Sequence, residues 1–99
     1  MQVIIENSNP VVAHLQGRLD TAAAAEIAPD FQTLAEQAAQ HIILDCSQLE
    51  YISSSGLRLF LALRKESAAK GGKLQVRAIN ADIRQVFMMT GFISLFEII

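Results

Sequence analysis

The sequence contains a single cysteine, Cys46, and this scarcity excludes two kinds of site. One thiol cannot form a disulfide within the chain, and it cannot supply the paired ligands of a cysteine metal site. A lone cysteine in an apolar stretch usually behaves as a small hydrophobic residue. We therefore predict that Cys46 is buried and that the protein works in a reducing compartment.

An excess of basic residues is also missing. The chain has 8 Lys and Arg residues against 10 Asp and Glu residues, a net charge of −2, whereas nucleic-acid-binding domains normally carry a basic patch or stripe. No apolar run approaches the ~18 residues needed to span a bilayer, and the first residues lack the pattern of a signal peptide. The composition predicts a cytoplasmic protein with no membrane span and no nucleic-acid partner.

Nothing in the sequence divides the chain, because it has no linker, no internal repeat and no run of like charges. Its 99 residues suit one compact domain. Hydrophobic residues make up 52% of the chain and charged residues 18%, which is enough apolar material for a substantial core. We predict a single domain over residues 1–99.

Five segments have the composition of β-strands. They are residues 2–6, 11–17, 41–47, 73–80 and 94–99. The turn-forming residues Asn-Ser-Asn-Pro between the first two segments predict a hairpin. The third segment, His-Ile-Ile-Leu-Asp-Cys-Ser, is almost continuously apolar, which is typical of a central strand covered on both faces.

Helical segments alternate with the later strands. The alanine-rich residues 20–40 predict the first helix, since alanine is the best helix former. Pro29 lies inside this segment, and a proline removes a backbone donor and crowds the preceding turn. We therefore expect a kink or a break near Ala28.

The second and third helices have recognisable ends. The second is expected to begin in a run of serines and to end at Gly71, where a glycine can adopt the left-handed conformation. The third covers residues 81–90, between the candidate N-cap Asn80 and the stop at Gly91. Strands that alternate with helices predict an α/β fold, with three main helices packed on a mixed sheet of about five strands.

Three consecutive serines, Ser53, Ser54 and Ser55, lie where a strand-like segment meets the second helix. The simplest interpretation is a helix cap, because a serine oxygen accepts a hydrogen bond from a first-turn N–H group and stabilises the helix by ~1 kcal/mol. A cap needs only one serine. A helix N-terminus also stabilises anions, including a phosphate attached to serine. The local chemistry leaves both a plain cap and a phosphorylation site open.

The second helix divides into two sides on a helical wheel. One side holds Phe60, Leu63 and Ser67, with Leu57 and Leu59 beside them, and the other holds Arg58, Ala62, Lys65 and Ala69, with Leu61 at its margin. The outer side mixes small apolar and basic residues, as a protein-binding surface does. The alternative interpretation is a partly exposed helix with a basic rim and no partner.

Catalytic and metal sites find little support in the sequence. A serine hydrolase needs Gly-x-Ser-x-Gly with a histidine and a carboxylate in reach, and no glycine precedes these serines. His14 and His41 lie in predicted strands, where a structural role is common. Asp20 and Asp45 are each more simply interpreted as a strand-end or helix-cap carboxylate than as metal ligands. We expect no catalysis, no cofactor and no metal.

Residues 44–60, Leu-Asp-Cys-Ser-Gln-Leu-Glu-Tyr-Ile-Ser-Ser-Ser-Gly-Leu-Arg-Leu-Phe, resemble the signature of the sulfate transporter and anti-sigma factor antagonist (STAS) domain family. That signature is a strand ending in Asp-x-Ser, followed by Asp-Ser-Ser-Gly-Leu or a variant that opens a helix. The Gly-Arg-Leu-Asp element at residues 17–20 and the closing residues 71–98 also resemble the family. The resemblance covers nearly the whole chain.

The resemblance implies a switch. In the bacterial regulators of the family, the serine directly before Ser/Thr-Gly is phosphorylated by a kinase that is also an anti-sigma factor, and a phosphatase restores it. That residue corresponds to Ser54 here. The unmodified protein is then expected to bind the serine-kinase anti-sigma factor, and phosphorylation to end the binding. The residues expected to contact protein partners are Asp20, Ser53, Ser55, Gly56, Leu57, Arg58, Leu61 and Ala62.

Two alternatives remain open within the family. The best-known members have Asp where this chain has Ser53, and the change can mean a different kinase or a protein that binds partners without being phosphorylated. Small STAS domains also serve as non-phosphorylated subunits of a transporter ATPase complex or as scaffold components of stress-sensing assemblies.

Overall fold

The computed structural model describes residues 1–99 as a five-stranded sheet with helices packed on it. The strands are β1 (Gln2–Glu6), β2 (Val11–Leu19), β3 (His41–Ile52), β4 (Lys73–Arg77) and β5 (Glu97–Ile98). The helices are α1 (Thr21–Glu36), α2 (Ser54–Ala69), α3 (Ala81–Thr90) and a short 3₁₀ helix, η1 (Phe92–Ser94). The predicted α/β fold is confirmed.

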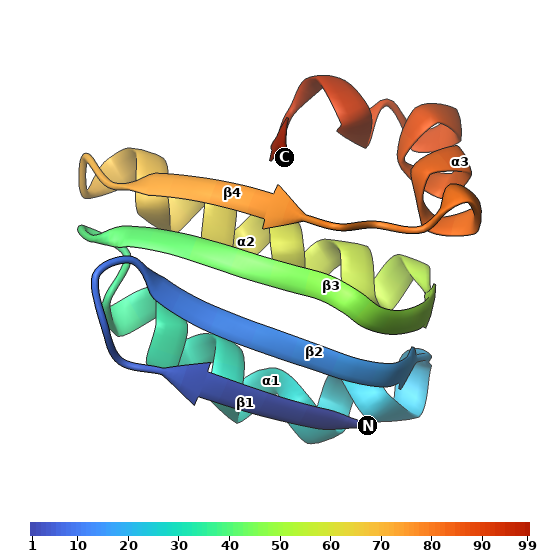
Figure 1. Cartoon of the computed structure of the whole chain (residues 1–99), viewed down its shortest axis with the longest axis horizontal. Coiled ribbons are helices and arrows are strands. Elements are labelled where there is room, and N and C mark those ends of the chain that lie inside the picture. Colours follow the sequence, from blue (N-terminus) through green and yellow to red (C-terminus); the bar gives the residue numbers. More distant parts are fainter.

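The strands lie in the order β1-β2-β3-β4-β5, with β1 antiparallel to β2 and every other neighbouring pair parallel. The predicted hairpin and the central position of β3 are therefore confirmed. Helices α1 and α2 follow the parallel strands β2 and β3, so both begin at the same end of the sheet and run in the same direction (Figure 1).

Only one face of the sheet is covered by α1 and α2, which lie behind it in Figure 1. Residues 42–46 of β3 are nevertheless all buried, so the prediction of a strand covered on both faces is confirmed for them. Ile42 and Leu44 belong to the main core. Ile43 and Asp45, which alternate with them, point to the open face and are flanked there by side chains of β2 and β4.

The core between the sheet and the helices contains four of the five phenylalanines of the chain, and the fifth, Phe92, is partly buried and packs against it. Phe60 of α2 is at its centre: its ring centroid lies 5.8 Å from Phe31 of α1, 6.3 Å from Phe87 of α3 and 6.3 Å from Phe96 near the C-terminus. These aromatic contacts join the three helices to the last segment of the chain. None of the helices has both the length and the apolar character needed to cross a membrane.

Helix α1 runs without a break through Pro29, so the predicted break near Ala28 is wrong. Pro29 lies on the exposed side of the helix, where water can bond the carbonyl that the proline leaves without a partner. Ile27 and Phe31, on either side of it, are buried and hold both halves of the helix against the core. The helix ends at Glu36, earlier than the alanine pattern indicates.

Strand β3 is longer than predicted and stays paired with β2 as far as Ile52, which lies opposite Leu19. Strand β4 ends at Arg77, three residues early, and β5 is only Glu97–Ile98 because η1 occupies part of the expected last strand. The two predicted ends of α3 are confirmed: the Asn80 side chain accepts a hydrogen bond from Ile83 N, 2.8 Å away, and Gly91 is left-handed with φ 77°.

Asp45 lies within β3, on the open face of the sheet, and not at a strand end as predicted. Its Oδ1 accepts hydrogen bonds from Ser47 N at 2.9 Å and Ser47 Oγ at 2.6 Å, and its Oδ2 accepts from Arg77 Nη2 at 2.7 Å. Burial raises the pKa of this carboxyl, but the bonds from Ser47 and Arg77 outweigh it and lower the pKa to about 2. Cys46 beside it is buried, as predicted, and burial raises its thiol pKa to about 12.

The lowered pKa of Asp45 predicts an acid-sensitive contribution to stability. The carboxylate stabilises the folded state fully above its ordinary pKa of 3.8, and this stabilisation is lost as the pH falls toward about 2. We expect Asp45→Asn to remove about 2 kcal/mol at pH 7 and much less near pH 2. Urea unfolding at a series of pH values measures the difference, and an equal loss at pH 7 and pH 2 would contradict the assignment.

Candidate functional site

The serine run directly follows the end of β3. Ser53 has an extended backbone, with φ −89° and ψ 172°, and its Oγ accepts a hydrogen bond from Gly56 N at 3.2 Å. Its carbonyl oxygen accepts from Leu57 N at 2.9 Å. Ser53 is therefore the N-cap of α2, and the helix begins at Ser54.

A second helix N-terminus lies beside the first. Ser53 N donates a hydrogen bond of 2.8 Å to the carbonyl oxygen of Leu19, the last residue of β2. The next residue, Asp20, caps α1 by accepting from Ala23 N at 2.8 Å through its Oδ1. The structure thus brings Asp20 and the serines together, and two positive helix ends share one edge of the sheet.

Ser54 and Ser55 are not used by the cap. Ser54 is exposed and Ser55 is half-buried, and neither hydroxyl makes a hydrogen bond within the chain. The side-chain hydrogen bond that caps the helix is made by Ser53. The N–H groups of a first helical turn have no acceptor inside the helix. Ser54 therefore presents a free hydroxyl beside backbone donors that can stabilise an anion.

Gly56 has no room for a side chain. A Cβ at this position would lie 2.6 Å from Leu19 Cγ and 2.9 Å from Ile52 Cγ1, which is too close for atoms that are not bonded. Leu57, the next residue, is only 5% exposed. Both residues are buried and seat the helix on the strand ends, and their expected contact with a partner stays a prediction.

The predicted two sides of α2 are confirmed. Phe60, Leu63 and Ser67 are buried, whereas Arg58, Ala62, Lys65 and Ala69 are exposed and Leu61 is half-buried. The exposed side begins one turn after Ser54, so the free hydroxyl and the mixed apolar and basic residues form one continuous surface. We call Asp20, Ser54, Ser55, Arg58, Leu61 and Ala62 the α2 surface.

With this geometry in place, comparison with known proteins identifies the family. The model of the STAS domain family matches residues 2–99. The chain belongs to the STAS domain family. BtrV of Bordetella bronchiseptica, a candidate anti-sigma factor antagonist, is 31% identical over 88 residues, which are 89% of this chain and 76% of BtrV.

Two further STAS relatives have related descriptions. The anti-sigma F factor antagonist of Paenibacillus polymyxa is 27% identical over 101 residues, covering 99% of this chain and 86% of the relative. The solved structure of the phosphorylated form of the Bacillus cell fate determinant SpoIIAA has a TM-score of 0.73 and 27% identity, covering 99% of this chain and 91% of SpoIIAA. The unphosphorylated form of SpoIIAA, an anti-sigma factor antagonist, has a TM-score of 0.74.

Sequence reasoning missed a feature on the other side of the same strand ends of this STAS domain. The guanidinium of Arg18 lies over the ring of Tyr51, 4.6 Å from its centroid, and both line a hollow of about 170 Å³ together with Asp82 and Val86 of α3. Leu19 and Ile52 point inward at the ends of two neighbouring parallel strands. The residues before them, Arg18 and Tyr51, therefore had to share the opposite face, and this alternation was the signal.

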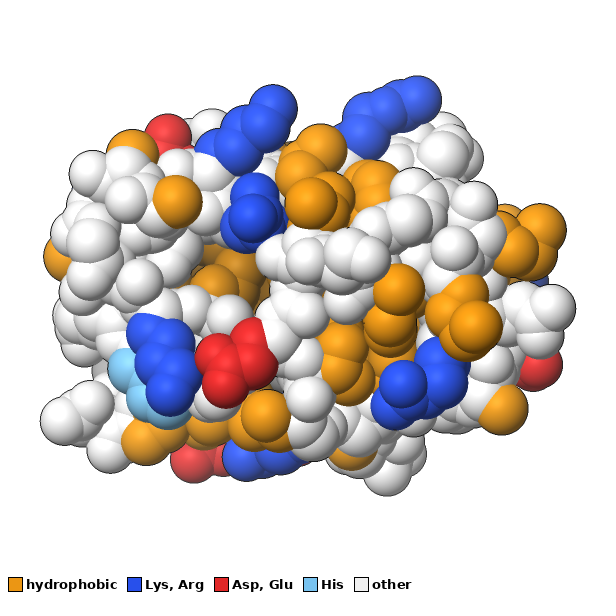
Figure 2. Space-filling model, turned by 90° about the horizontal axis from the view of Figure 1, so that it is seen from above, with side chains coloured by type: hydrophobic (Ala, Val, Ile, Leu, Met, Phe, Trp, Pro, Cys, Tyr) orange, Lys and Arg blue, Asp and Glu red, His pale blue; other side chains and the backbone are white.

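Figure 2 shows a further exposed apolar area of the STAS domain, seen from the side of β4 and α3, with Lys and Arg side chains around it. Met88 and Met89, at the end of α3, are 62% and 79% exposed. Methionine surfaces adapt readily to a partner. Apolar surface is therefore available to a docked protein beyond the α2 surface.

Both histidines of the STAS domain are engaged in the sheet. His14 of β2 pairs with Glu6 of β1, and His41 Nε2 lies 2.6 Å from Gln75 Oε1. Neither makes a side-chain contact with the serines, and no group of three potential metal-ligating residues is found. The chemistry that the arrangement offers is anion stabilisation at an exposed hydroxyl, next to the mixed apolar and basic residues of the α2 surface.

The position of the cap predicts that substitutions of Ser53 and Ser54 have different effects on the free energy of unfolding. Ser53→Ala removes the acceptor for Gly56 N, so we expect it to lower the free energy of unfolding by ~1 kcal/mol. Ser53→Asp keeps an acceptor and adds a negative charge at a positive helix end, so we expect no loss. Ser54→Ala is the matched control and should stay within ~0.5 kcal/mol. Urea denaturation tests all three, and a larger loss for Ser54→Ala than for Ser53→Ala would contradict this cap.

Proposed function

We propose that the protein is an anti-sigma factor antagonist whose binding is controlled by phosphorylation of Ser54. One observation carries the proposal: Ser53 supplies the cap of α2, and this leaves the exposed Ser54 hydroxyl free at a helix N-terminus. Descriptions of the relatives as anti-sigma factor antagonists, and of SpoIIAA in a phosphorylated form, support it.

The proposed mechanism is competition by binding, without catalysis. The unmodified protein binds a serine kinase that is also an anti-sigma factor, with the α2 surface as the contact. The kinase then releases the factor that it holds. Transfer of the γ-phosphoryl group of ATP to Ser54 Oγ ends the binding, and a serine phosphatase hydrolyses the ester to restore the hydroxyl.

The same phosphate has opposite effects on folding and on binding. It carries about −1.5 to −2 charges at neutral pH, and the free N–H groups and positive end of α2 compensate them in the monomer. Within a docked surface the phosphate loses water and needs a cation on the partner. A cost of about 3 kcal/mol weakens a micromolar complex to nearly millimolar. The folded monomer therefore tolerates a modification that the complex does not.

Phosphorylation itself gives the first test. Incubation with the cognate serine kinase and ATP is expected to add one phosphate, because only one of the three serine hydroxyls is both exposed and free of the cap. Tandem mass spectrometry locates the modified residue. Ser54→Ala should abolish the modification, and Ser53→Asp should preserve it. Modification of Ser53 or Ser55 in the wild type would refute the assignment.

Binding gives the second test. Phosphorylated protein, or Ser54→Asp as an imperfect substitute, is expected to bind the kinase at least ~100-fold more weakly than unmodified protein. The melting temperature should not fall. Ser94→Asp, at an exposed serine outside the α2 surface, is the control and should bind like the wild type. Unchanged affinity after phosphorylation would refute the switch.

A further inference from the structure

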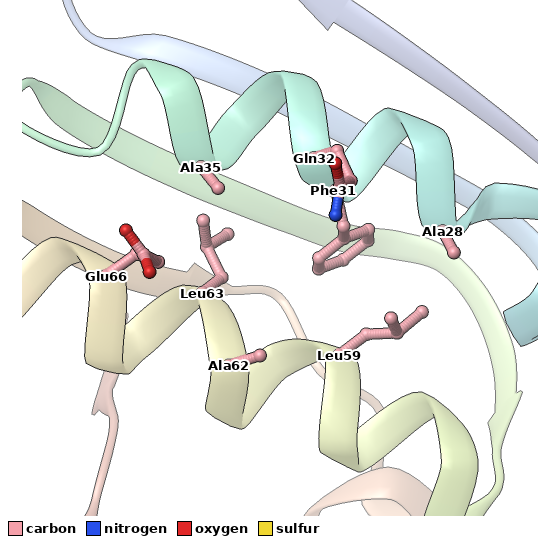
Figure 3. Close-up of a pocket in the computed structure, with 8 residues that line it drawn as sticks. All are labelled: Ala28, Phe31, Gln32, Ala35, Leu59, Ala62, Leu63 and Glu66. Carbon is pink, nitrogen blue, oxygen red and sulfur yellow. The ribbon is translucent and has the colours of Figure 1, made fainter.

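A groove runs between the outer sides of α1 and α2. It has a volume of about 250 Å³. Phe31 of α1 and Leu63 of α2 point toward one another at its base, and Leu59 stands at its side (Figure 3). Phe31 and Leu63 are buried, but Leu59 is only partly covered, so apolar surface remains open at the mouth.

Alanines keep the groove open. Ala28 and Ala35, two turns apart on α1, face Ala62 of α2 across it. Residues seven apart lie on the same side of a helix, so the two alanines of α1 line one wall. The alanine content of α1 raises its helix propensity, and here it also leaves a hollow that longer side chains would fill.

The groove is almost neutral, but its α2 side is bordered by cations. Glu66 is the one charged residue in the lining, and its carboxylate lies 3.7 Å from Lys70 Nζ. Arg58 and Lys65, on the exposed ridge of α2 next to Ala62, have no carboxylate partner within the chain. A ligand of the groove therefore meets apolar surface first and unpaired positive charge along one border.

The groove continues the α2 surface. Ala62 belongs to both, and Leu59 lies one turn after Ser55 on the same helix. A rigid protein that covers Ser54 and Arg58 extends over the mouth of the groove after one or two further turns of α2.

We propose that the groove receives an amphipathic helix of the serine-kinase partner, which inserts apolar side chains between α1 and α2 and places Asp or Glu residues beside Arg58 and Lys65. The inference rests on the proposed function, because it takes that partner as the occupant. A helix that binds in such a groove contacts it through its own apolar residues, which are spaced three, four and seven positions apart. Apolar side chains buried in such a pocket carry much of the binding energy of an interface.

Filling the groove is the direct test. Ala28→Leu and Ala35→Leu place larger apolar side chains in it from α1, outside the α2 surface, and each should weaken binding to the purified cognate kinase at least ~10-fold. Neither should lower the melting temperature, because the new side chain covers apolar surface. Ala68→Leu, at an exposed position of α2 outside the groove, is the matched control and should bind like the wild type.

The charged border has its own test. Lys65→Glu should weaken the same complex and reduce its dependence on salt, since it removes attraction to acidic residues of the partner. Lys73→Glu makes the same charge change on β4, away from the groove, and should change the affinity little. Equal effects of the two variants would refute the acidic border of the partner helix.

The outcomes separate this inference from the function on which it rests. If the wild type does not bind the kinase, both fail. If the wild type binds, phosphorylation of Ser54 releases it, and the correctly folded Ala28→Leu and Ala35→Leu variants bind within ~2-fold of the wild type, the groove is not the contact and the switch stands. Circular dichroism and thermal unfolding of each variant verify its fold, and either variant alone suffices for the test.

Discussion

Gly56 lies so close to the strand ends that an added Cβ would come within 2.6 Å of Leu19. This close approach, together with the hydrogen bond from Ser53 N to the carbonyl of Leu19, seats α2 directly on β2 and β3. The cap, the free hydroxyl of Ser54 and the neighbouring Asp20 all take their positions from it. A side chain at residue 56 would displace the start of the helix, and the α2 surface would no longer be one surface.

Features of the site that depend on short-range chemistry could be predicted from the sequence. A polar residue before a helix and a glycine after it have strong local preferences, and this identified the cap in the serine run and both ends of α3. The buried and exposed sides of α2 follow from helical periodicity alone. The burial of Gly56 and Leu57 was not anticipated, because it depends on the contact with Leu19, which is distant in the sequence.

The remaining differences also arise from contacts between distant segments. The continuity of α1 through Pro29 depends on which side of the helix faces water, and on the burial of Ile27 and Phe31 on either side. The extension of β3 depends on its pairing with β2, whose register shifts between His14 and Gln16 and again after Gly17. The groove depends on alanines of two helices meeting across a gap. None of these contacts between distant segments can be recognised from a local pattern in the sequence.

Helices α1 and α2 begin side by side and run in the same direction, and this has an electrostatic consequence. Parallel helix dipoles repel one another, and their positive ends add at the shared edge of the sheet. Asp20 supplies a carboxylate to α1, but the cap of α2 is a neutral serine and its first turn contains no acidic residue. The start of α2 in the unmodified domain therefore carries a positive partial charge that no acidic residue of its own first turn offsets. The fold therefore favours a negative charge, such as that of a phosphate, at the start of α2.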